Sequence, residues 1–256
     1  MAFTNKKILI TGSSRGIGLA TAQRFLAEGA RIVINGRTDE TVQAALNSLD
    51  GGEMVSGVVA DMAQVAGCEF LVNEAVNTLG GLDILVTAAG VAYALPIEET
   101  NEEIWDQTLD INLKGLFFTC RAALQALRES GGCIVNIASD SGVRGEAFLA
   151  AYCASKAAVM NMTKAMALEL APHVRVNSVC PGYVDTDMVR RDYIDKAEDP
   201  AQFEGELLQG TPMGRLAKPS EIAAAVCYLS GPDSGFITGS CLSIDGGTSA
   251  GSYAEF

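Results

Sequence analysis

Tyr152 and Lys156, four residues apart, are the side chains of this 256-residue chain whose types and spacing first suggest chemistry. On a helix this spacing puts both on one face, one turn apart. An ammonium group near a phenol favours the phenolate and lowers the tyrosine pKa from about 10. Such a tyrosine can act as a general acid or base. Many Tyr-x-x-x-Lys pairs are only surface neighbours, so this interpretation needs support from elsewhere in the chain.

A glycine-rich turn near the N-terminus supplies that support. The apolar run 7–10 predicts a buried strand, and Gly12, Gly16 and Gly18 follow it. Glycines here let the backbone approach a pyrophosphate closely, and the next helix offers free N–H groups and a partial positive charge. The spacing Gly-x-x-x-Gly-x-Gly differs from the common Gly-x-Gly-x-x-Gly. We predict a dinucleotide site, with a plain strand–turn–helix as the alternative.

Strand-like and helix-like segments alternate along the whole chain. The predicted strands are 6–11, 31–35, 54–59, 82–87, 132–138, 174–180 and 240–245. The predicted helices are 16–28, 39–49, 63–79, 101–129, 151–171 and 219–230. This alternation predicts an α/β fold, a Rossmann-type doubly wound parallel sheet of about seven strands with helices on both faces. Ligands bind such sheets at the carboxyl ends of the strands, where all the motifs fall.

Composition bounds the class of protein. The chain is 48% apolar and 19% charged, and no linker, repeat or low-complexity tract divides it, so we predict one domain over 1–256. The net charge of −13 argues against nucleic acid as a partner. No apolar stretch reaches the roughly 18 residues of a membrane span. The N-terminus runs straight into a strand, which leaves no room for a signal peptide.

Cysteine and histidine usage narrows the chemistry. The seven cysteines are odd in number and form no Cys-x-x-Cys pair, which predicts buried thiols in a reducing cytoplasm. The single histidine, His173, follows Pro172 at a predicted helix end and reads as a surface residue. One histidine nearly excludes a His-based metal site or a serine–histidine triad, so we expect no metal.

One segment, 185–215, breaks the alternation. Acidic residues outnumber basic ones between Asp185 and Glu206, and no strand pattern is present. A long insertion at the ligand-binding edge of a sheet is usually functional. We therefore predict a mobile lid that closes on substrate, with a solvated pair of helices as the alternative.

Together the motifs resemble the short-chain dehydrogenase/reductase family, over essentially the whole chain. They are the turn 11–18, Asn112 within 110–115, Ser139, Tyr152 with Lys156, Pro181-Gly182 and Asp245-Gly246-Gly247. Their joint occurrence in this order is far more specific than any one of them. Within the family the chain is similar to NADP-preferring ketone reductases and to 3-oxoacyl-carrier-protein reductases.

The resemblance implies a role for each catalytic candidate. Tyr152 would be the general acid in carbonyl reduction and the base in alcohol oxidation, and the nicotinamide would supply the hydride. Lys156 would hold the nicotinamide ribose and lower the Tyr152 pKa. Ser139 would hydrogen-bond the substrate oxygen, and Asn112 would hold a water linking Lys156 to solvent. Ser141 is an alternative hydroxyl, although it lies two residues short of the family spacing.

The same resemblance implies the cofactor contacts. They are Gly12, Ser14, Arg15, Gly16, Ile17, Gly18, Arg37, Asp61, Ala89, Gly90, Tyr152, Lys156, Pro181, Gly182, Val184 and Thr186. Asp61 would bind the adenine, and Val184 and Thr186 the carboxamide and a neighbouring phosphate. The chain departs from the family at Thr87 and Ala88, where two asparagines are usual, which puts the side-chain hydrogen bonds of the fourth strand in doubt.

The end of the second strand bears on the choice of nicotinamide. An NAD site needs an acid there to accept from the ribose 2′-hydroxyl, but the sequence has none before Asp39. Arg37 is placed to pair with a 2′-phosphate, and Arg15 is a second candidate. We predict NADP(H), with NAD(H) as the less favoured option.

The substrate side is less informative. Pocket candidates are Tyr93, Arg144, Phe148, Tyr183 and Met188, together with the nearby 91, 95, 143 and 149. Most are apolar, which favours a hydrophobic ketone or secondary alcohol as the small-molecule substrate. Arg144 either binds an anionic group or lies on the surface.

Three functions compete. The first is a general NADPH-dependent ketone reductase. The second is a 3-oxoacyl-carrier-protein reductase, which would need basic residues such as Arg121 and Arg128 near the site mouth, yet the end of the next helix, 170–173, lacks the basic residue expected of such enzymes. The third, a non-catalytic cofactor-sensing protein, would not need four catalytic residues together.

Two long helices, 101–129 and 151–171, resemble those that pair between subunits in this family. Apolar residues suited to a four-helix interface are Leu116, Phe117, Leu124, Val159, Met162 and Met166, with packing inside their own chain as the alternative. We predict a homotetramer, with a dimer as the fallback.

Overall fold

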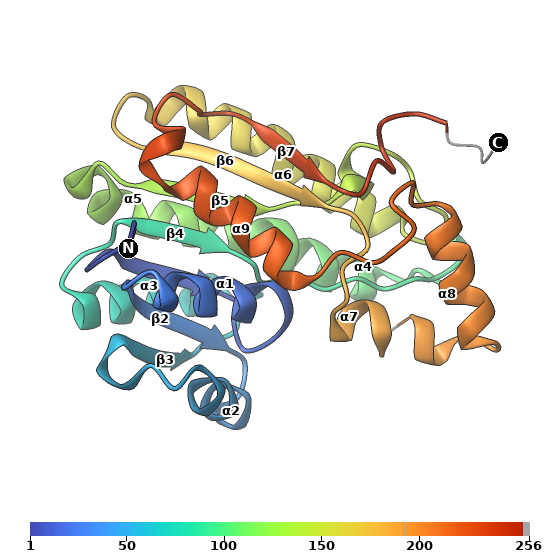
Figure 1. Ribbon diagram of the computed structural model, residues 1–256, viewed down its shortest axis with the longest axis horizontal. Coiled ribbons are helices and arrows are strands. Elements are labelled where there is room, and N and C mark those ends of the chain that lie inside the picture. The colour runs from blue at the N-terminus through green and yellow to red at the C-terminus, as the bar shows by residue number, and fades with distance from the viewer. Residues whose placement is uncertain (192, 253–256) are drawn as a thin grey trace.

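A computed structural model of the chain describes residues 1–191 and 193–252. Its centre is a sheet of seven parallel strands in the order β3-β2-β1-β4-β5-β6-β7 (Figure 1). The strands are β1 Lys7–Thr11, β2 Arg31–Gly36, β3 Val55–Val59, β4 Ile84–Thr87, β5 Cys133–Ile137, β6 Arg175–Pro181 and β7 Cys241–Ile244. The predicted doubly wound fold is confirmed, with small shifts at the strand ends.

Helices cover both faces of the sheet. They are α1 Gly16–Ala27, α2 Asp39–Leu49, α3 Val65–Leu79, α4 Glu102–Leu109, α5 Leu116–Ser130, α6 Ala150–Leu170, α7 Asp187–Arg190, α8 Pro200–Gln209 and α9 Pro219–Ser230. On one face α1 and α9 pack together and bury Phe25 and Ile222 (Figure 1). On the other, α3, α5 and α6 bury Leu71, Cys120 and Val159. The continuous apolar strands are thus shielded on both sides.

The predicted helix 101–129 is not a single regular helix. It consists of α4, a π-helical stretch Asp110–Gly115 and α5. A Cβ on Gly115 would overlap the carbonyl oxygen of Met62, so a glycine is needed where the helix meets that turn. π-Helical turns are rare and often mark functional sites. Here the turn contains the predicted catalytic residue Asn112, which is fully buried.

Two short helices lie beyond the carboxyl ends of the strands, in the segment that breaks the alternation (Figure 1). Asp199 caps α8 by accepting from the backbone N–H groups of Ala201 and Gln202, and Pro200 begins the helix. Arg190 of α7 pairs with Asp185 and with Glu204 of α8, both at 2.7 Å. The Arg190–Glu204 pair joins the two helices beyond the ligand-binding edge of the sheet.

The apolar residues predicted for a subunit interface divide into two groups. Leu116, Val159 and Met166 are buried within their own chain, so they are not available to a partner subunit. Leu124 and Met162 are half-buried, and Phe117 remains 41% exposed. Trp105 on α4, which was not predicted, is 43% exposed. Part of the apolar surface that the sequence assigned to a subunit interface is therefore buried in the core of the same chain.

The state of the cysteines and the character of the helices can both be stated for the described residues. All seven cysteines are free thiols. None of the helices in the described residues combines the length and the apolar character that crossing a membrane requires.

Candidate active site

A cavity of about 1020 Å³ opens at the carboxyl ends of the strands, beside the point where the strand order reverses between β1 and β4. Ligands bind doubly wound sheets at this point. The glycine-rich turn, the segments after β2, β4, β5 and β6, and helices α6, α7 and α8 all line it. All sixteen residues predicted to bind the cofactor line this one cavity.

The glycine-rich turn fits a dinucleotide phosphate. Gly12 has φ 58°, and a Cβ there would lie 2.5 Å from Cα of Ala89. A Cβ on Gly18 would lie 2.5 Å from the carbonyl oxygen of Gly12, so the helix packs closely on the turn. Within the described residues no side chain caps α1 and no acid lies in its first turn. Its backbone N–H groups are therefore suited to a phosphate.

Asn35 fixes this turn and was not among the residues predicted from the sequence. Its Oδ1 accepts from the backbone N–H of Gly12 at 3.1 Å, and its Nδ2 donates to the carbonyl oxygens of Val58 and Ala60 at 3.3 and 3.1 Å. The fully buried amide thus joins the end of β2 to the glycine-rich turn and to the end of β3. A polar residue ending an apolar strand was the available signal.

Other side chains hold the end of β4, where the family usually has two asparagines at the positions of Thr87 and Ala88. Thr11 Oγ1 accepts from the backbone N–H groups of Ala88 and Ala89, both at 3.1 Å. Thr87 Oγ1 donates to Asn136 Oδ1 at 2.8 Å. The end of β4 is therefore held by threonines.

Tyr152 and Lys156 lie one turn apart on α6, as predicted. Lys156 is 5% exposed, and its Nζ donates to the carbonyl oxygen of Ile137 at 2.8 Å. The same Nζ lies 5.7 Å from the centroid of the Tyr152 ring. Burial lowers the pKa of Lys156 to about 8. This lysine is therefore poised to lose its charge just above neutral pH.

The predicted lowering of the Tyr152 pKa by Lys156 is wrong. Loss of water contact raises the pKa of Tyr152 to about 12, and a hydrogen bond with Ser139 opposes this only in part. The lysine ammonium faces the ring and the Ile137 carbonyl oxygen, and Asp140 and Glu146 add negative charge nearby. Tyr152 therefore holds its proton strongly, which suits a general acid.

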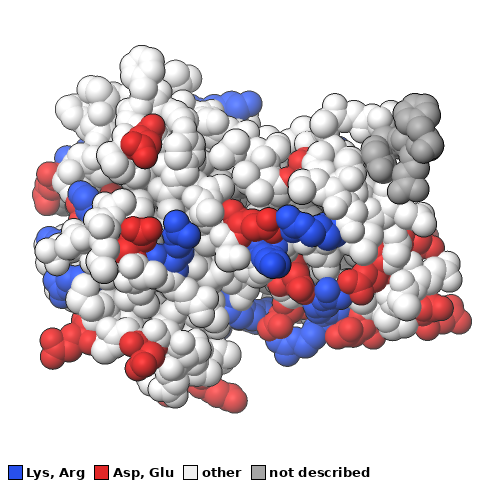
Figure 2. Space-filling model, in the orientation of Figure 1, with Lys and Arg blue, Asp and Glu red and all other residues white. Residues whose placement is uncertain are grey.

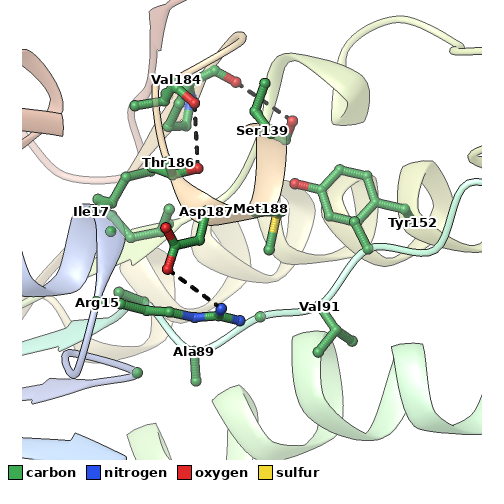
Figure 3. Close-up of a pocket in the computed structure, with 18 of the residues that line it drawn as sticks. Arg15, Ile17, Ala89, Val91, Ser139, Tyr152, Val184, Thr186, Asp187 and Met188 are labelled. Atoms are coloured by element: carbon green, nitrogen blue, oxygen red, sulfur yellow. Dashed lines mark hydrogen bonds and ion pairs between the residues drawn. The ribbon is translucent and has the colours of Figure 1, made fainter. Parts of the chain in front are cut away.

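Ser139, and not Ser141, pairs with Tyr152. Figure 3 shows the Tyr152 hydroxyl directed toward Ser139 across the cavity. Ser139 Oγ accepts from the backbone N–H of Ser141 at 3.2 Å, which fixes its position. Ser141 Oγ instead donates to Glu146 Oε2 at 2.8 Å.

Asn112 lies behind the catalytic pair, outside the cavity lining. Its Oδ1 accepts from the backbone N–H of Val91, and its Nδ2 donates to the Val91 carbonyl oxygen, both at 2.8 Å. The Nδ2 also donates to Ser155 Oγ at 3.1 Å. A Cβ on Gly90 would lie 3.3 Å from Asn112 Oδ1 and 3.6 Å from Lys156 Nζ. The side chain predicted to hold a water therefore positions the backbone beside Lys156.

Two arginines flank the cofactor part of the cavity. Arg37 follows β2, where no acid stands, and Arg15 lies in the glycine-rich turn. Arg15 Nη1 is 3.8 Å from Asp187 Oδ2 at the start of α7 (Figure 3). Asp187 also pairs with Arg191. Acidic and basic side chains interleave over this side of the molecule in Figure 2.

The substrate side differs from the prediction. Phe148, Tyr183 and Met188 line the cavity, whereas Tyr93 and Arg144 do not. The Tyr93 hydroxyl donates to Gln107 Oε1 at 2.8 Å. Arg144 pairs with Asp140 at 3.1 Å, so its charge is neutralised by its own chain. An anion-binding role for Arg144 is therefore not supported.

The substrate side of the cavity also has a cluster of polar residues that was not predicted from the sequence. Asp140, Ser141 and Glu146 line the cavity, and Glu146 accepts from the hydroxyls of Ser141 and Tyr183. Burial and the Glu146 carboxylate raise the pKa of Tyr183, so this hydroxyl stays protonated. The cavity thus has a hydrogen-bonding wall beside its apolar one. Two acids within seven residues of a predicted catalytic serine were a usable signal.

The similarity to known proteins covers nearly the whole chain. Residues 12–249 match the family described as "Enoyl-(Acyl carrier protein) reductase". The chain is 38% identical to meso-2,3-butanediol dehydrogenase of Serratia marcescens over 98% of its length and 97% of that protein. It is 36% identical to the NADP-dependent (R)-specific alcohol dehydrogenase of Lentilactobacillus kefiri, over 96% and 97%.

A solved structure shows the same likeness. A single-residue variant of actinorhodin polyketide ketoreductase with NADPH superposes with a TM-score of 0.90 at 36% identity, over 97% of this chain and 99% of the other. The seven-stranded sheet agrees with this match. The chain is a member of the short-chain dehydrogenase/reductase family, whose enzymes act on CH–OH and C=O groups.

Proposed function

We propose that this protein is an NADP(H)-dependent oxidoreductase that interconverts a ketone and a secondary alcohol. The observation that carries the proposal is that Tyr152, Ser139 and Lys156 line the same cavity as Arg15 and Arg37. A proton donor and two cations suited to a 2′-phosphate thus share one site.

The residues divide the work in carbonyl reduction. Tyr152 gives its proton to the substrate oxygen, and its raised pKa keeps that proton available at neutral pH. Ser139 hydrogen-bonds the same oxygen, and Lys156 binds the nicotinamide ribose. The nicotinamide supplies the hydride when it is bound. In alcohol oxidation Tyr152 accepts the proton.

NADP(H) is favoured over NAD(H) by charge. Arg15 and Arg37 provide two guanidinium groups for a 2′-phosphate, and β2 ends in Asn35-Gly36 without the acid that an NAD site uses. The printed names of the Lentilactobacillus relative and of the ketoreductase structure, which mention NADP and NADPH, support the same choice.

The substrate proposed is a free ketone or secondary alcohol. Apolar Phe148 and Met188 and the polar Glu146 and Tyr183 suit a small molecule with one apolar part and one further hydrogen-bonding group. The second candidate is a 3-oxoacyl-carrier-protein reductase, the activity in the name of a relative from Chlamydia muridarum that is 34% identical. Arg121, which such a role would use, pairs with Glu69 at 2.6 Å. This pairing supports the stand-alone enzyme.

We also propose that 185–215 acts as the substrate lid. Met188 of α7 and Phe203 and Leu207 of α8 line the cavity, so this segment covers it from the open side of the sheet. A homotetramer remains our proposal for the assembly, built on exposed Trp105 and Phe117 of α4 and α5. Light scattering at micromolar protein tests it, and a monomeric mass would contradict it.

The function is tested by following NADPH and NADH oxidation with one panel of ketones. The panel holds 3-hydroxy-2-butanone, an aliphatic, an aryl and a cyclic ketone, a diketone and an acetoacetyl thioester. We expect NADPH-linked turnover of free ketones that Tyr152→Phe abolishes while NADPH still binds. Preferred turnover of the thioester would support the carrier-protein function. Tyr152→Phe activity close to that of the unmodified enzyme would remove Tyr152 from its role.

A further inference from the structure

One wall of the cavity is formed by three hydrogen-bonded polar side chains, Ser141, Glu146 and Tyr183, which we call the Glu146 cluster. Glu146 Oε2 accepts from Ser141 Oγ at 2.8 Å, and Glu146 Oε1 accepts from the Tyr183 hydroxyl. A serine or tyrosine hydroxyl has a single hydrogen to donate. Both hydroxyl hydrogens of the Glu146 cluster are therefore used on the carboxylate.

Arg144 brings further hydrogen-bond donors to the cluster, but it does not line the cavity. Its Nε donates to Asp140 Oδ2 at 3.1 Å, and its Nη2 lies 3.1 Å from the same oxygen and 3.7 Å from Glu146 Oε2. Arg144 also hydrogen-bonds the Tyr183 hydroxyl. A ligand in the cavity thus meets the lone pairs of the Glu146 cluster and none of its hydrogens.

Glu146 keeps acceptor capacity and charge for a ligand. A carboxylate offers about four lone-pair sites, and the two hydroxyls take one on each oxygen. The single guanidinium of Arg144 faces both Asp140 and Glu146, so it balances the two carboxylates only in part. The Glu146 side chain is 17% exposed and lines the cavity.

The Glu146 cluster lies directly beside the reacting centre. The backbone N–H of Ser141 donates to Ser139 Oγ at 3.2 Å, so the cluster begins next to the serine proposed to hold the substrate oxygen. Loss of water contact chiefly raises the pKa of Tyr152, and the Glu146 charge adds to that rise. The carboxylate is therefore within reach of a group on the carbon next to the reacting one.

We propose that Glu146 determines substrate specificity by accepting a hydrogen bond from a donor group, a hydroxyl or an ammonium, on the carbon next to the reacting carbon. An ether or a carboxylate brings no hydrogen to the Glu146 cluster, and a carboxylate also meets a like charge. The substrates are then vicinal diols or amino alcohols and the corresponding ketones. This inference rests on the proposed function and narrows its substrate class.

The test compares derivatives of 2-propanol that differ only in the substituent on the carbon next to the alcohol. They are 1,2-propanediol, 1-amino-2-propanol, 1-methoxy-2-propanol, 2-butanol and 3-hydroxybutyrate, each as the racemate. NADP⁺ reduction is followed near neutral pH, where the amine is charged. We expect kcat/KM for the diol and the amino alcohol to exceed that for the methoxy ether at least about tenfold, the scale of one hydrogen bond to a charged group. The carboxylate should be the poorest substrate, and the better of the two donors identifies the natural group.

Glu146→Gln assigns this preference to the carboxylate. The amide keeps the shape, but it has no charge and only one oxygen, which the Ser141 and Tyr183 hydroxyls compete for. We expect the diol-to-ether ratio of kcat/KM to fall about tenfold, and 3-hydroxybutyrate to gain relative to 2-butanol. Glu69→Gln is the matched control, because Glu69 pairs with Arg121 at 2.6 Å and neither residue lines the cavity. That variant should keep both ratios.

The outcomes separate this inference from the proposed function. Equal kcat/KM for the diol and the ether, or an unchanged ratio in Glu146→Gln, would overturn the inference and leave the function standing. If Glu146→Gln does not fold, Tyr183→Phe is the second variant. It frees Oε1 of Glu146, so the diol-to-ether ratio should rise, and a ratio that stays or falls overturns the inference. No turnover of any ketone or alcohol with either cofactor would overturn the proposed function and the inference with it.

Discussion

Asn112 holds both backbone polar groups of Val91, with its Oδ1 on the N–H and its Nδ2 on the carbonyl oxygen, each at 2.8 Å. The asparagine is in the π-helical turn between α4 and α5, and Val91 lies four residues beyond β4. Gly90 lies between this pair and Lys156. The contact therefore couples an irregular helical turn to the loop that lines the catalytic centre.

Replacing Asn112 with aspartate should break this contact. The carboxylate cannot donate to the Val91 carbonyl oxygen or to Ser155 Oγ, and the site is fully buried. We expect Asn112→Asp to lose about 2–4 kcal/mol of unfolding free energy, with lower turnover. Urea denaturation measures it. The control is Asn101→Asp, an exposed helix cap that accepts from the Ile104 N–H and tolerates either residue. Equal losses in both variants would contradict this account.

The pH dependence of ketone reduction should follow Lys156 and not Tyr152. Burial lowers the Lys156 pKa to about 8 and raises the Tyr152 pKa to about 12. As the pH rises, Lys156 loses its charge first, while Tyr152 still holds its proton. We therefore expect kcat/KM for reduction to fall above about pH 8.

A lysine-to-arginine exchange identifies the group responsible for this limb. In Lys156→Arg the guanidinium stays charged, so any remaining activity should show no alkaline limb below about pH 10. Steady-state kinetics with 3-hydroxy-2-butanone and NADPH from pH 6 to 10, in roughly one-unit steps, measures both profiles. A limb that stays near pH 8 in the arginine variant would assign it to another group.

Cofactor preference should depend on Arg37. A charge-assisted contact to a 2′-phosphate contributes about 1.5–3 kcal/mol, so Arg37→Asp should shift the NADPH-to-NADH ratio of kcat/KM by at least about tenfold toward NADH. The comparison is Arg24→Asp, the same charge change in the last turn of α1, where Arg24 pairs with Glu28. An unchanged ratio in Arg37→Asp would contradict the cofactor argument.

Asp187 should weaken NADPH binding by pairing with Arg15. The pair is 3.8 Å apart and both side chains are about half exposed, so its contribution is below about 1 kcal/mol. We expect Asp187→Asn to tighten NADPH relative to NADH by about two- to fivefold, measured by fluorescence titration. Asp185→Asn removes a carboxylate that pairs with Arg190 instead, and it should leave the ratio unchanged.

Phe148 combines substrate contact with an unfavourable backbone. It lines the cavity with φ 67°, a left-handed conformation that costs a non-glycine residue about 1–2 kcal/mol. Phe148→Gly and Phe148→Ala should both raise the KM for apolar ketones. The glycine variant should nevertheless be the more stable of the two by about 1 kcal/mol in thermal unfolding.

The usual order of glycine and alanine provides the control for this prediction. At Leu168, exposed on α6, the glycine variant should be less stable than the alanine variant by about 1 kcal/mol. The same order at both positions would show that the Phe148 backbone is not strained.

The sequence by itself determined the fold and most of the candidate site. Apolar strands, alternating helices and glycines at a phosphate-binding turn are local patterns, and parallel strands bring their carboxyl ends to one edge. The motifs after β1, β4, β5 and β6 therefore had to meet. Tyr152 and Lys156 share a face of α6 because helical spacing requires it.

Only the tertiary structure decided how these groups are tuned. A pKa depends on water and charge from segments distant in sequence, so spacing suggested a lowered Tyr152 pKa where burial raises it. The pairing of Arg144 with Asp140, which removes it from the cavity, and the tie from Asn112 to Val91 likewise depend on side-chain directions after packing. The pattern of strands and helices determines the fold and brings the motifs to one edge of the sheet. Three-dimensional packing then decides which polar groups remain available to a ligand.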